Sequence, residues 1–200
     1  MAHYADEQLE ITRVVVGPLD NNVFVARCRH TGRAALVDAA DDGPMLVDLC
    51  RELGVELVIE THGHADHTRA VPAVREAGLP VWVTAEDAPL LPGYDRLLTD
   101  GQVLEVGRLR LQAIHTPGHT PGSICFKVEG SPVLFSGDTL FPGGPGATRG
   151  DARRFRQILR SIEERLFVLP DDTHVLPGHG KDTTIGAERP DFEEWAARGW

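Results

Sequence analysis

One short stretch, Thr61-His62-Gly63-His64-Ala65-Asp66-His67, places three imidazoles and a carboxylate within a single turn of the chain. Imidazole and carboxylate suit zinc and neighbouring first-row metals, whereas a set of thiolates would indicate a closed structural site. The alternation of His62 and His64 lets two rings grip one ion from an extended backbone. Asp66 and His67, on a turn that enters a helix, can face a second ion, so the stretch predicts ligands for two metals.

Three later turns repeat one arrangement, in which an apolar strand is followed by a tight turn and one residue of metal-ligand type. They centre on His119 in TPGHTPGS, on Asp138 in SGDTL and on His179 in PGHG. Any one of these residues alone is more often an ordinary turn residue, and a lone histidine-rich tract is also typical of adventitious metal binding. Together the four segments predict seven ligands at strand ends along one edge of the fold: His62, His64, Asp66, His67, His119, Asp138 and His179.

Apolar periodicity and turn residues predict the order of the secondary structure elements. Strands are expected at residues 9–16, 23–28, 34–37, 55–59, 81–83, 103–106, 109–114, 123–128, 133–135 and 173–176. Helices are expected at residues 43–53, with Gly54 as the stop, and at residues 66–77 and 151–166. Two sheet-forming stretches, each followed by helices, favour the α/β (α+β) class: an αββα sandwich of two packed mixed β-sheets with helices on both outer faces.

Two further segments stand out. Residues 142–150 contain four glycines and two prolines and show no periodicity, and loops of this kind more often serve a site than a core. The C-terminal tail ends in an aromatic amphipathic turn through Phe192, Trp195 and Trp200. We therefore expect the glycine-rich loop to border the metal site.

The composition indicates a single globular domain spanning residues 1–200. Hydrophobic residues make up 42% of the 200 and charged residues 25%, as in ordinary soluble proteins. The net charge of −10, without a dense cluster of Lys and Arg, argues against a nucleic-acid partner. Bound metal ions override the mean field nearby, so a small acidic substrate is still allowed. The expected partner is a small-molecule substrate, and the sequence leaves monomer and homodimer open.

Cysteine usage and the N-terminus indicate a cytoplasmic protein. The three cysteines, Cys28, Cys50 and Cys125, are odd in number and show no CxxC spacing, which predicts neither a disulfide framework nor a thiolate site. Residues 1–10 contain three acidic residues and no apolar run, so neither a secretion signal nor a membrane anchor is expected there.

The ligand pattern resembles the five-part signature of the metallo-β-lactamase superfamily, from about the first strand to the last turn. Within it, TPGHTPGS, GDTLF and PGHG look like the glyoxalase II group of thioester hydrolases. The resemblance implies the metallo-β-lactamase fold and two divalent metal ions, with zinc expected and iron or manganese as alternatives. It further implies that His62, His64 and His119 hold one metal, that Asp66, His67 and His179 hold the other, and that Asp138 bridges them.

Such a site predicts a binuclear metal-dependent hydrolase. Two metals that share a water would lower its pKa towards about 7, which makes a bridging hydroxide available to attack a carbonyl. Asp66 and Asp138 are the expected catalytic residues, and Asp66 would orient the hydroxide or transfer a proton. His115, just before the TPGH turn, is expected either to orient a ligand through an outer hydrogen bond or to be a structural residue.

The substrate is predicted from positions where this chain differs from glyoxalase II proteins as well as from those where it matches them. Full-length glyoxalase II proteins carry a further helical segment for glutathione, and this chain ends 21 residues after His179, so no separate C-terminal glutathione-binding domain is expected. Where the glutathione-using members have a basic residue, this chain has Ala147, with Arg149 as the candidate substrate-binding residue nearby. The expected substrate is therefore a thioester of a low-molecular-weight thiol, and the departure at Ala147 leaves a thiol other than glutathione open.

One alternative activity shares this scaffold. Residues 60–67 also look like the ETHxHADH motif of persulfide dioxygenases, in which a single iron would be held by His62, His119 and Asp138. The GDTLF stretch and the missing basic residue favour the hydrolase. A binding module without catalysis is disfavoured by the complete ligand set.

Overall fold

The computed structural model of this protein describes residues 2–199, so the predicted aromatic position Trp200 lies outside the described residues. One mixed sheet contains seven strands in chain order, antiparallel as far as β4 and parallel from β4 to β7. Its strands are β1 (Tyr4–Ala5), β2 (Leu9–Val16), β3 (Asn21–Cys28), β4 (Ala34–Val37), β5 (Val55–Ile59), β6 (Val81–Thr84) and β7 (Arg96–Leu98).

The second mixed sheet has the strand order β15-β14-β11-β10-β9-β8, and only β11 and β14 pair in parallel among these described strands. Its strands are β8 (Val103–Val106), β9 (Leu109–His115), β10 (Ile124–Val128), β11 (Val133–Gly137), β14 (His174–Pro177) and β15 (Thr183–Thr184). A hairpin of β12 (Leu140–Phe141) and β13 (Gly144–Pro145) follows β11. It occupies part of the glycine-rich loop that the sequence left without structure.

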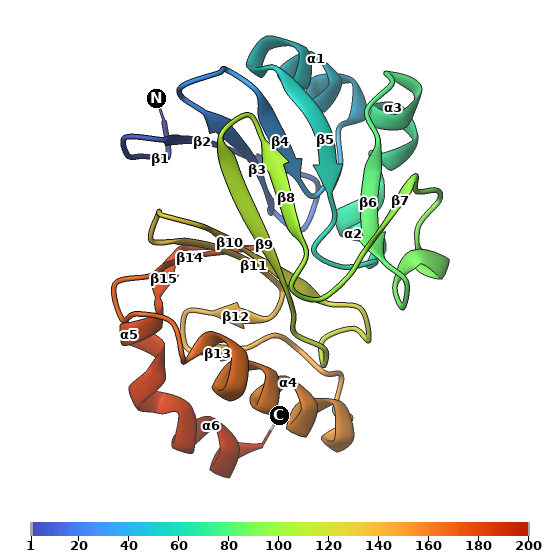
Figure 1. Cartoon of the computed structure of the whole chain (residues 1–200). Coiled ribbons are helices and arrows are strands. Elements are labelled where there is room, and N and C mark those ends of the chain that lie inside the picture. The colour runs from blue at the N-terminus through green and yellow to red at the C-terminus, as the bar shows by residue number, and fades with distance from the viewer. Residues whose placement is uncertain (1, 200) are drawn as a thin grey trace.

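Helices cover the outer face of each sheet, so the chain forms four layers (Figure 1). On the first sheet lie α1 (Gly43–Leu53) and α3 (Val71–Glu76), with the single turn α2 (Ala65–Thr68) near the sheet edge. On the second sheet lie α4 (Ala152–Ser161), α5 (Ile185–Glu188) and α6 (Phe192–Arg198). The predicted stop of α1 is confirmed, because Gly54 adopts φ 72° and its N–H caps Cys50 O. The predicted αββα sandwich is confirmed.

Three apolar clusters fill the spaces between these layers. The first lies between the sheets and includes Phe24 and Phe135, whose ring centroids are 5.5 Å apart. The second joins the first sheet to α1 and α3, and the third joins the second sheet to α4 and to Trp195 of α6. Both sheets are therefore covered on both faces, which explains why β3 and β4 are almost continuously buried.

The single helix predicted over residues 66–77 is wrong, because the chain breaks between α2 and α3. The Arg69 N–H donates to Ala40 O and the Ala70 N–H to Ala39 O, so both leave the helical pattern to bond the loop after β4. Pro72, in the first turn of α3, adds no donor of its own. As a result α2 is a separate turn. The helix predicted over residues 151–166 is confirmed, as an α-helix over Ala152–Ser161 that continues as a π-helical turn over Ile162–Leu166.

Within residues 2–199, no helix is both long and apolar enough to cross a membrane.

Candidate metal centre

The predicted ligands lie on four connections that meet at one edge of the two sheets. The first sheet supplies the segment after β5, and the second supplies the turns after β9, β11 and β14. Backbone hydrogen bonds join these connections across the sheets: the Ile124 N–H donates to Thr61 O, and the Asn22 N–H donates to Gly178 O. The edge is thus held by the protein backbone as well as by side chains.

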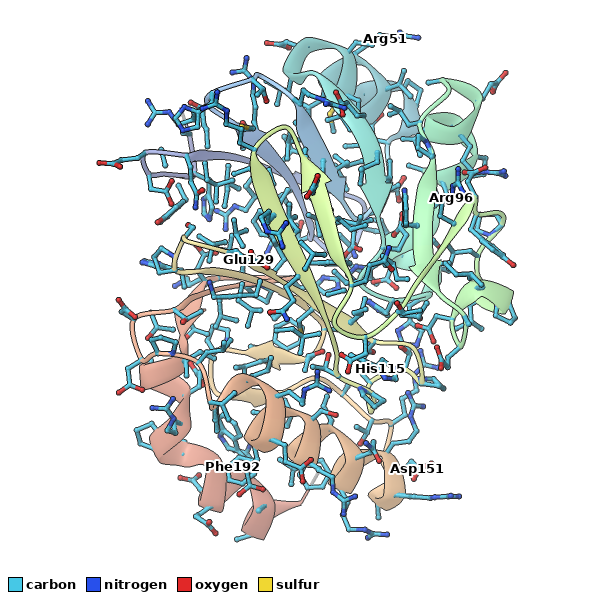
Figure 2. The ribbon with its side chains drawn as sticks, viewed as in Figure 1. Arg51, Arg96, His115, Glu129, Asp151 and Phe192 are labelled. Atoms are coloured by element: carbon cyan, nitrogen blue, oxygen red, sulfur yellow. The ribbon has the colours of Figure 1, made fainter. Side chains whose placement is uncertain are left out.

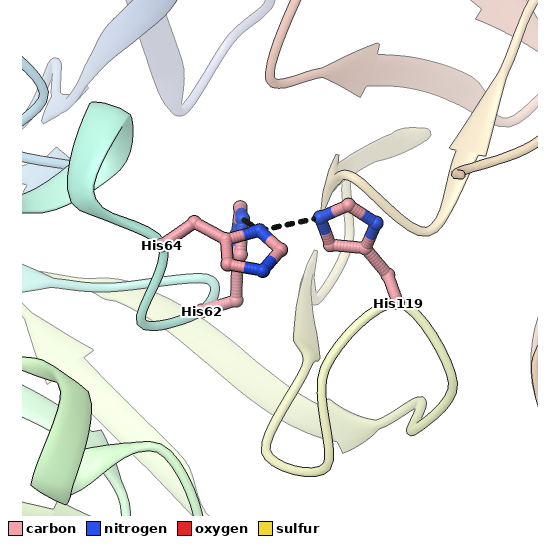
Figure 3. A group of neighbouring side chains, drawn as sticks. All are labelled: His62, His64 and His119. Carbon is pink, nitrogen blue, oxygen red and sulfur yellow. Dashed lines mark hydrogen bonds between the residues drawn. The ribbon is translucent and has the colours of Figure 1, made fainter. Parts of the chain in front are cut away.

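Three histidines form the first ligand group: His62, His64 and His119 (Figure 3). The Nδ1 of His64 lies 3.1 Å from Nε2 of His62 and 2.8 Å from Nε2 of His119, and the three ligand atoms all lie within 4.8 Å of one another. Three imidazole nitrogens that face one point are the donor set of a catalytic zinc site.

The second ligand group consists of Asp66, His67 and His179. The Nε2 atoms of the two histidines are 3.1 Å apart, and Oδ2 of Asp66 lies 3.3 Å from His179 Nε2 and 3.5 Å from His67 Nε2. A mixed set of two imidazoles and one carboxylate suits zinc, iron or manganese.

Asp138 lies between the two groups. Its Oδ2 is 3.5 Å from His119 Nε2 and 3.7 Å from His179 Nε2, and its Oδ1 is 3.5 Å from His67 Nε2. The Oδ1 atom is buried and has no hydrogen-bond partner among the described residues. An orphaned buried carboxylate oxygen is costly unless a cation compensates it. All seven predicted positions therefore meet, and the donors fit a binuclear metal site.

Each group has outer hydrogen bonds that fix its rings, and sequence reasoning missed the most important partner. Asp38 Oδ2 lies 2.9 Å from His67 Nδ1 and also accepts the Thr61 hydroxyl, while Asp38 Oδ1 accepts the Thr61 N–H. Such partners orient metal-binding rings and raise their basicity. A sequence signal existed, since Asp38 directly follows an apolar strand, as the predicted ligands do. The remaining outer contacts pair His62 Nδ1 with Thr61 Oγ1, His119 Nδ1 with Ala147 O and His179 Nδ1 with Leu19 O.

Two further predicted residues lie at the margin of the site. His115, at the end of β9 (Figure 2), contacts none of the seven: its Nε2 lies 3.0 Å from Pro121 O, on the loop that carries His119. Its ring therefore supports that loop and does not orient a ligand. Arg149 is exposed, and its positive charge, after burial, is the next cause that lowers the pKa of His64. Arg149 thus belongs to the rim of the first ligand group.

Burial and neighbouring charges shift the pKa values of the two groups in opposite directions. Burial lowers the pKa of His62 well below its usual value, and burial together with His64 lowers the pKa of His119 to about 3. Burial also opposes protonation of His67, but the carboxylates around it, first Asp138, outweigh this and raise its pKa to about 9. In the metal-free protein the imidazoles of the first group are therefore uncharged at neutral pH, whereas His67 of the second group is protonated.

This contrast predicts different pH dependences for the two sites. A pKa of about 9 means that His67 carries a proton that a metal must displace, so zinc affinity of the second group should rise by about tenfold per pH unit between about pH 6.5 and 8.5. Affinity of the first group should stay nearly constant in that range. Zinc titration of metal-free protein against a chelator gives both constants. A common pH dependence for the two ions would contradict the expected separation.

A cavity of about 310 Å³ opens beside the ligands. It is lined by His119, Asp138, His179 and residues 141–147, and its loop wall consists of Phe, Pro, Gly and Ala. This volume suits part of a small-molecule substrate. A larger hollow of about 720 Å³ beside α3 includes Arg75 and Asp95, which pair with each other, so we assign no chemistry to it.

Comparison with known proteins agrees with this geometry. The family model described as "Metallo-beta-lactamase superfamily" matches residues 16–179, which contain all seven ligand positions. The chain is 33% identical over 181 residues to a hydroxyacylglutathione hydrolase, GloC, of Haemophilus influenzae, covering 78% of this chain and 84% of that protein.

Several solved structures share the fold. The B3 metallo-beta-lactamase BLEG-1 superimposes with a TM-score of 0.82 at 30% identity, over 90% of this chain and 96% of that one. TTHA1623, solved in a di-iron-bound form, superimposes with a TM-score of 0.78 at 31% identity, which covers 89% of this chain and 96% of that one. ETHE1 from Myxococcus xanthus superimposes with a TM-score of 0.77 at 28% identity, which covers 88% of this chain and 80% of that one. One of these similar chains, TTHA1623, therefore holds two irons on this fold.

Proposed function

Because this chain belongs to the metallo-beta-lactamase superfamily, we propose that it is a metal-dependent hydrolase that cleaves a thioester of a low-molecular-weight thiol. The proposed cofactors are two divalent metal ions, with zinc as the expected metal. The observation that carries the proposal is Asp138, whose two carboxylate oxygens face histidines of both ligand groups. The hydroxyacylglutathione hydrolase among its relatives supports a thioester as the bond that is cleaved.

Two ions held by these groups would supply Lewis acidity, which polarises a carbonyl and lowers the pKa of water to about 7. The chain's own carboxylates complete the chemistry. Hydrogen bonding by His179 lowers the pKa of Asp66, and the Asn21 side-chain amide donates to its Oδ2 over 3.0 Å. Asp66 is thus held as an ionised acceptor that can orient the attacking group or take its proton. Asp66 and Asp138 are the proposed catalytic residues.

The surroundings of the ligands suit an acyl group of modest size. The wall formed by residues 141–147 presents no charged side chain to the cavity, which favours an apolar acyl group there. Arg149 at the rim is the proposed substrate-binding residue, because it supplies a positive charge in a protein of net charge −10. A thiol that carries a carboxylate would be attracted there. All three cysteines are buried and unpaired, which is in keeping with the proposed cytoplasmic location.

The alternative is a persulfide dioxygenase with a mononuclear iron site at His62, His119 and Asp138. It is favoured by the stretch over residues 60–67, which matches the motif of that group. The second ligand group weighs against it. A mononuclear centre leaves Asp66, His67 and His179 without a role, although these three lie within ligand distance of one another.

An anaerobic assay separates the two activities. Zinc-loaded protein should hydrolyse at least one member of a panel of acyl thioesters, built on glutathione, coenzyme A and a neutral thiol, at the same rate with and without air. Free thiol should appear mole for mole with acid, and glutathione persulfide should cause no oxygen uptake, because zinc has no accessible redox change. Oxygen consumption by iron-loaded protein with persulfide, without turnover of any thioester, would refute the hydrolase.

A further inference from the structure

Asp87 is not a ligand, yet its carboxyl group joins the two segments that carry the first ligand group. It lies just before the 3-10 turn Ala88–Leu90 and is fully buried. Its Oδ2 accepts the Gly63 N–H over 2.8 Å and the Thr120 hydroxyl over 2.6 Å, and its Oδ1 accepts the Gly122 N–H over 2.8 Å. Gly63 separates His62 from His64, and Thr120 follows His119. One carboxyl group therefore connects all three histidines through the backbone.

The glycines on both segments make this close approach possible. A Cβ at Gly63 would lie 2.9 Å from Asp87 O and 2.8 Å from Leu90 Cβ, and a Cβ at Gly122 would lie 2.6 Å from Asp87 Cγ. Gly122 is also held by the Thr84 hydroxyl, which donates to its carbonyl over 2.8 Å. The two segments thus pack closely against Asp87 and its neighbours, and only glycine fits at positions 63 and 122.

The second ligand group has separate supports. Asp38 bonds His67, Asn21 bonds Asp66, and the Leu19 carbonyl bonds His179. No hydrogen bond of Asp87 reaches these residues in the described part of the chain. The two buried acids therefore differ in reach: Asp87 contacts only the segments of the first group, whereas Asp38 bonds His67 of the second group and also Thr61, which lies beside His62.

We propose that Asp87 is a positioning residue that holds the His62–His64 segment against the His119 loop and thereby sets the metal affinity of the first ligand group alone. The inference does not depend on which bond the protein cleaves. Its basis is one buried carboxyl group that makes three short hydrogen bonds to two segments. In the sequence these segments are far apart, since His64 and His119 are separated by 55 residues.

The test uses the isosteric change Asp87→Asn. The amide must direct its NH2 group at either the Gly63 and Thr120 donors or the Gly122 donor, so at least one donor loses its acceptor. Chelator competition should show one zinc ion bound about 10- to 100-fold more weakly and the other unchanged. Anomalous diffraction from crystals grown with one equivalent of zinc should place that ion at Asp66, His67 and His179.

Two matched carboxyl-to-amide variants complete the design. Asp38→Asn should weaken the second group and, because Asp38 also bonds Thr61 beside His62, should affect the first group as well, so that only Asp87→Asn weakens one ion alone. Asp95→Asn removes an exposed pair with Arg75 and a bond to the Val81 N–H, away from every ligand segment, and should leave both affinities unchanged. If Asp87→Asn does not fold, Thr120→Val removes one donor to Asp87 and should weaken the same ion by a smaller factor. Wild-type affinities, or equal weakening of both ions, would overturn the proposal.

Discussion

Replacing Asp138 with alanine should remove both metals and lower kcat/KM for the hydrolysed substrate by more than about 10³-fold. Asp138 is the residue whose oxygens face His67, His119 and His179 together, so its loss leaves each ligand group without the carboxylate between them. Metal content per chain and steady-state kinetics measure the two effects.

The matched control is His30→Ala. His30 is exposed on a turn remote from the ligand segments, and its loss should leave two metals and full activity. Comparable losses in both variants would mean that the effect of Asp138→Ala is one of stability. Thermal unfolding of both metal-free proteins provides that comparison directly.

Gly178→Ala should disable the site by steric means without removing any ligand. A Cβ at Gly178 would overlap Asp138 Oδ1 and lie 2.6 Å from His67 Cε1. The backbone cannot retreat easily, because the Gly178 N–H donates to Gly137 O over 2.9 Å and its carbonyl accepts the Asn22 N–H over 2.7 Å. We expect weaker metal binding and a loss of activity of about 100-fold or more, the cost of misplacing reacting groups by about 1 Å.

Gly180→Ala, two residues further along the same turn, is the control for Gly178. Its Cβ would enter open space, but Gly180 has φ 70°, so the change costs about 1 to 2 kcal/mol of backbone strain. Both metals should remain bound while the unfolding temperature falls. If Gly180→Ala instead loses its metals and Gly178→Ala keeps them, backbone strain and not space decides the geometry of this turn.

The ligand positions could be predicted from sequence because each is a local event. A strand, a tight turn and one imidazole or carboxylate fall within a few residues at His119, Asp138 and His179, and the apolar periodicity of the strands is read over equally short windows. The sandwich followed because helices alternate with runs of strands. Features that are encoded within a few consecutive residues could therefore be predicted.

The missed features depend on contacts between distant segments. Asp87 acts through Gly63 and Gly122, which are 24 and 35 residues away, and Asp38 acts through His67, which is 29 residues away. The break between α2 and α3 is likewise imposed by the carbonyls of Ala39 and Ala40, which capture two helical donors. Sequence patterns over short windows do not indicate these distant partners. Of the two roles that the sequence left open for His115, its bond to the nearby Pro121 carbonyl favours the structural one.

The three apolar clusters contain none of the seven ligands. A zinc finger unfolds without its ion, whereas the core of this chain is built from apolar side chains alone, so we expect the chain to fold without a metal. Loading is then a step that follows folding, and the preformed donors accept whichever divalent ion the surroundings supply at the time. Because imidazole and carboxylate ligands suit several first-row metals, availability contributes to which ion is bound. Batches of this protein made in media of different trace-metal content should therefore differ in the metal they carry while sharing one fold.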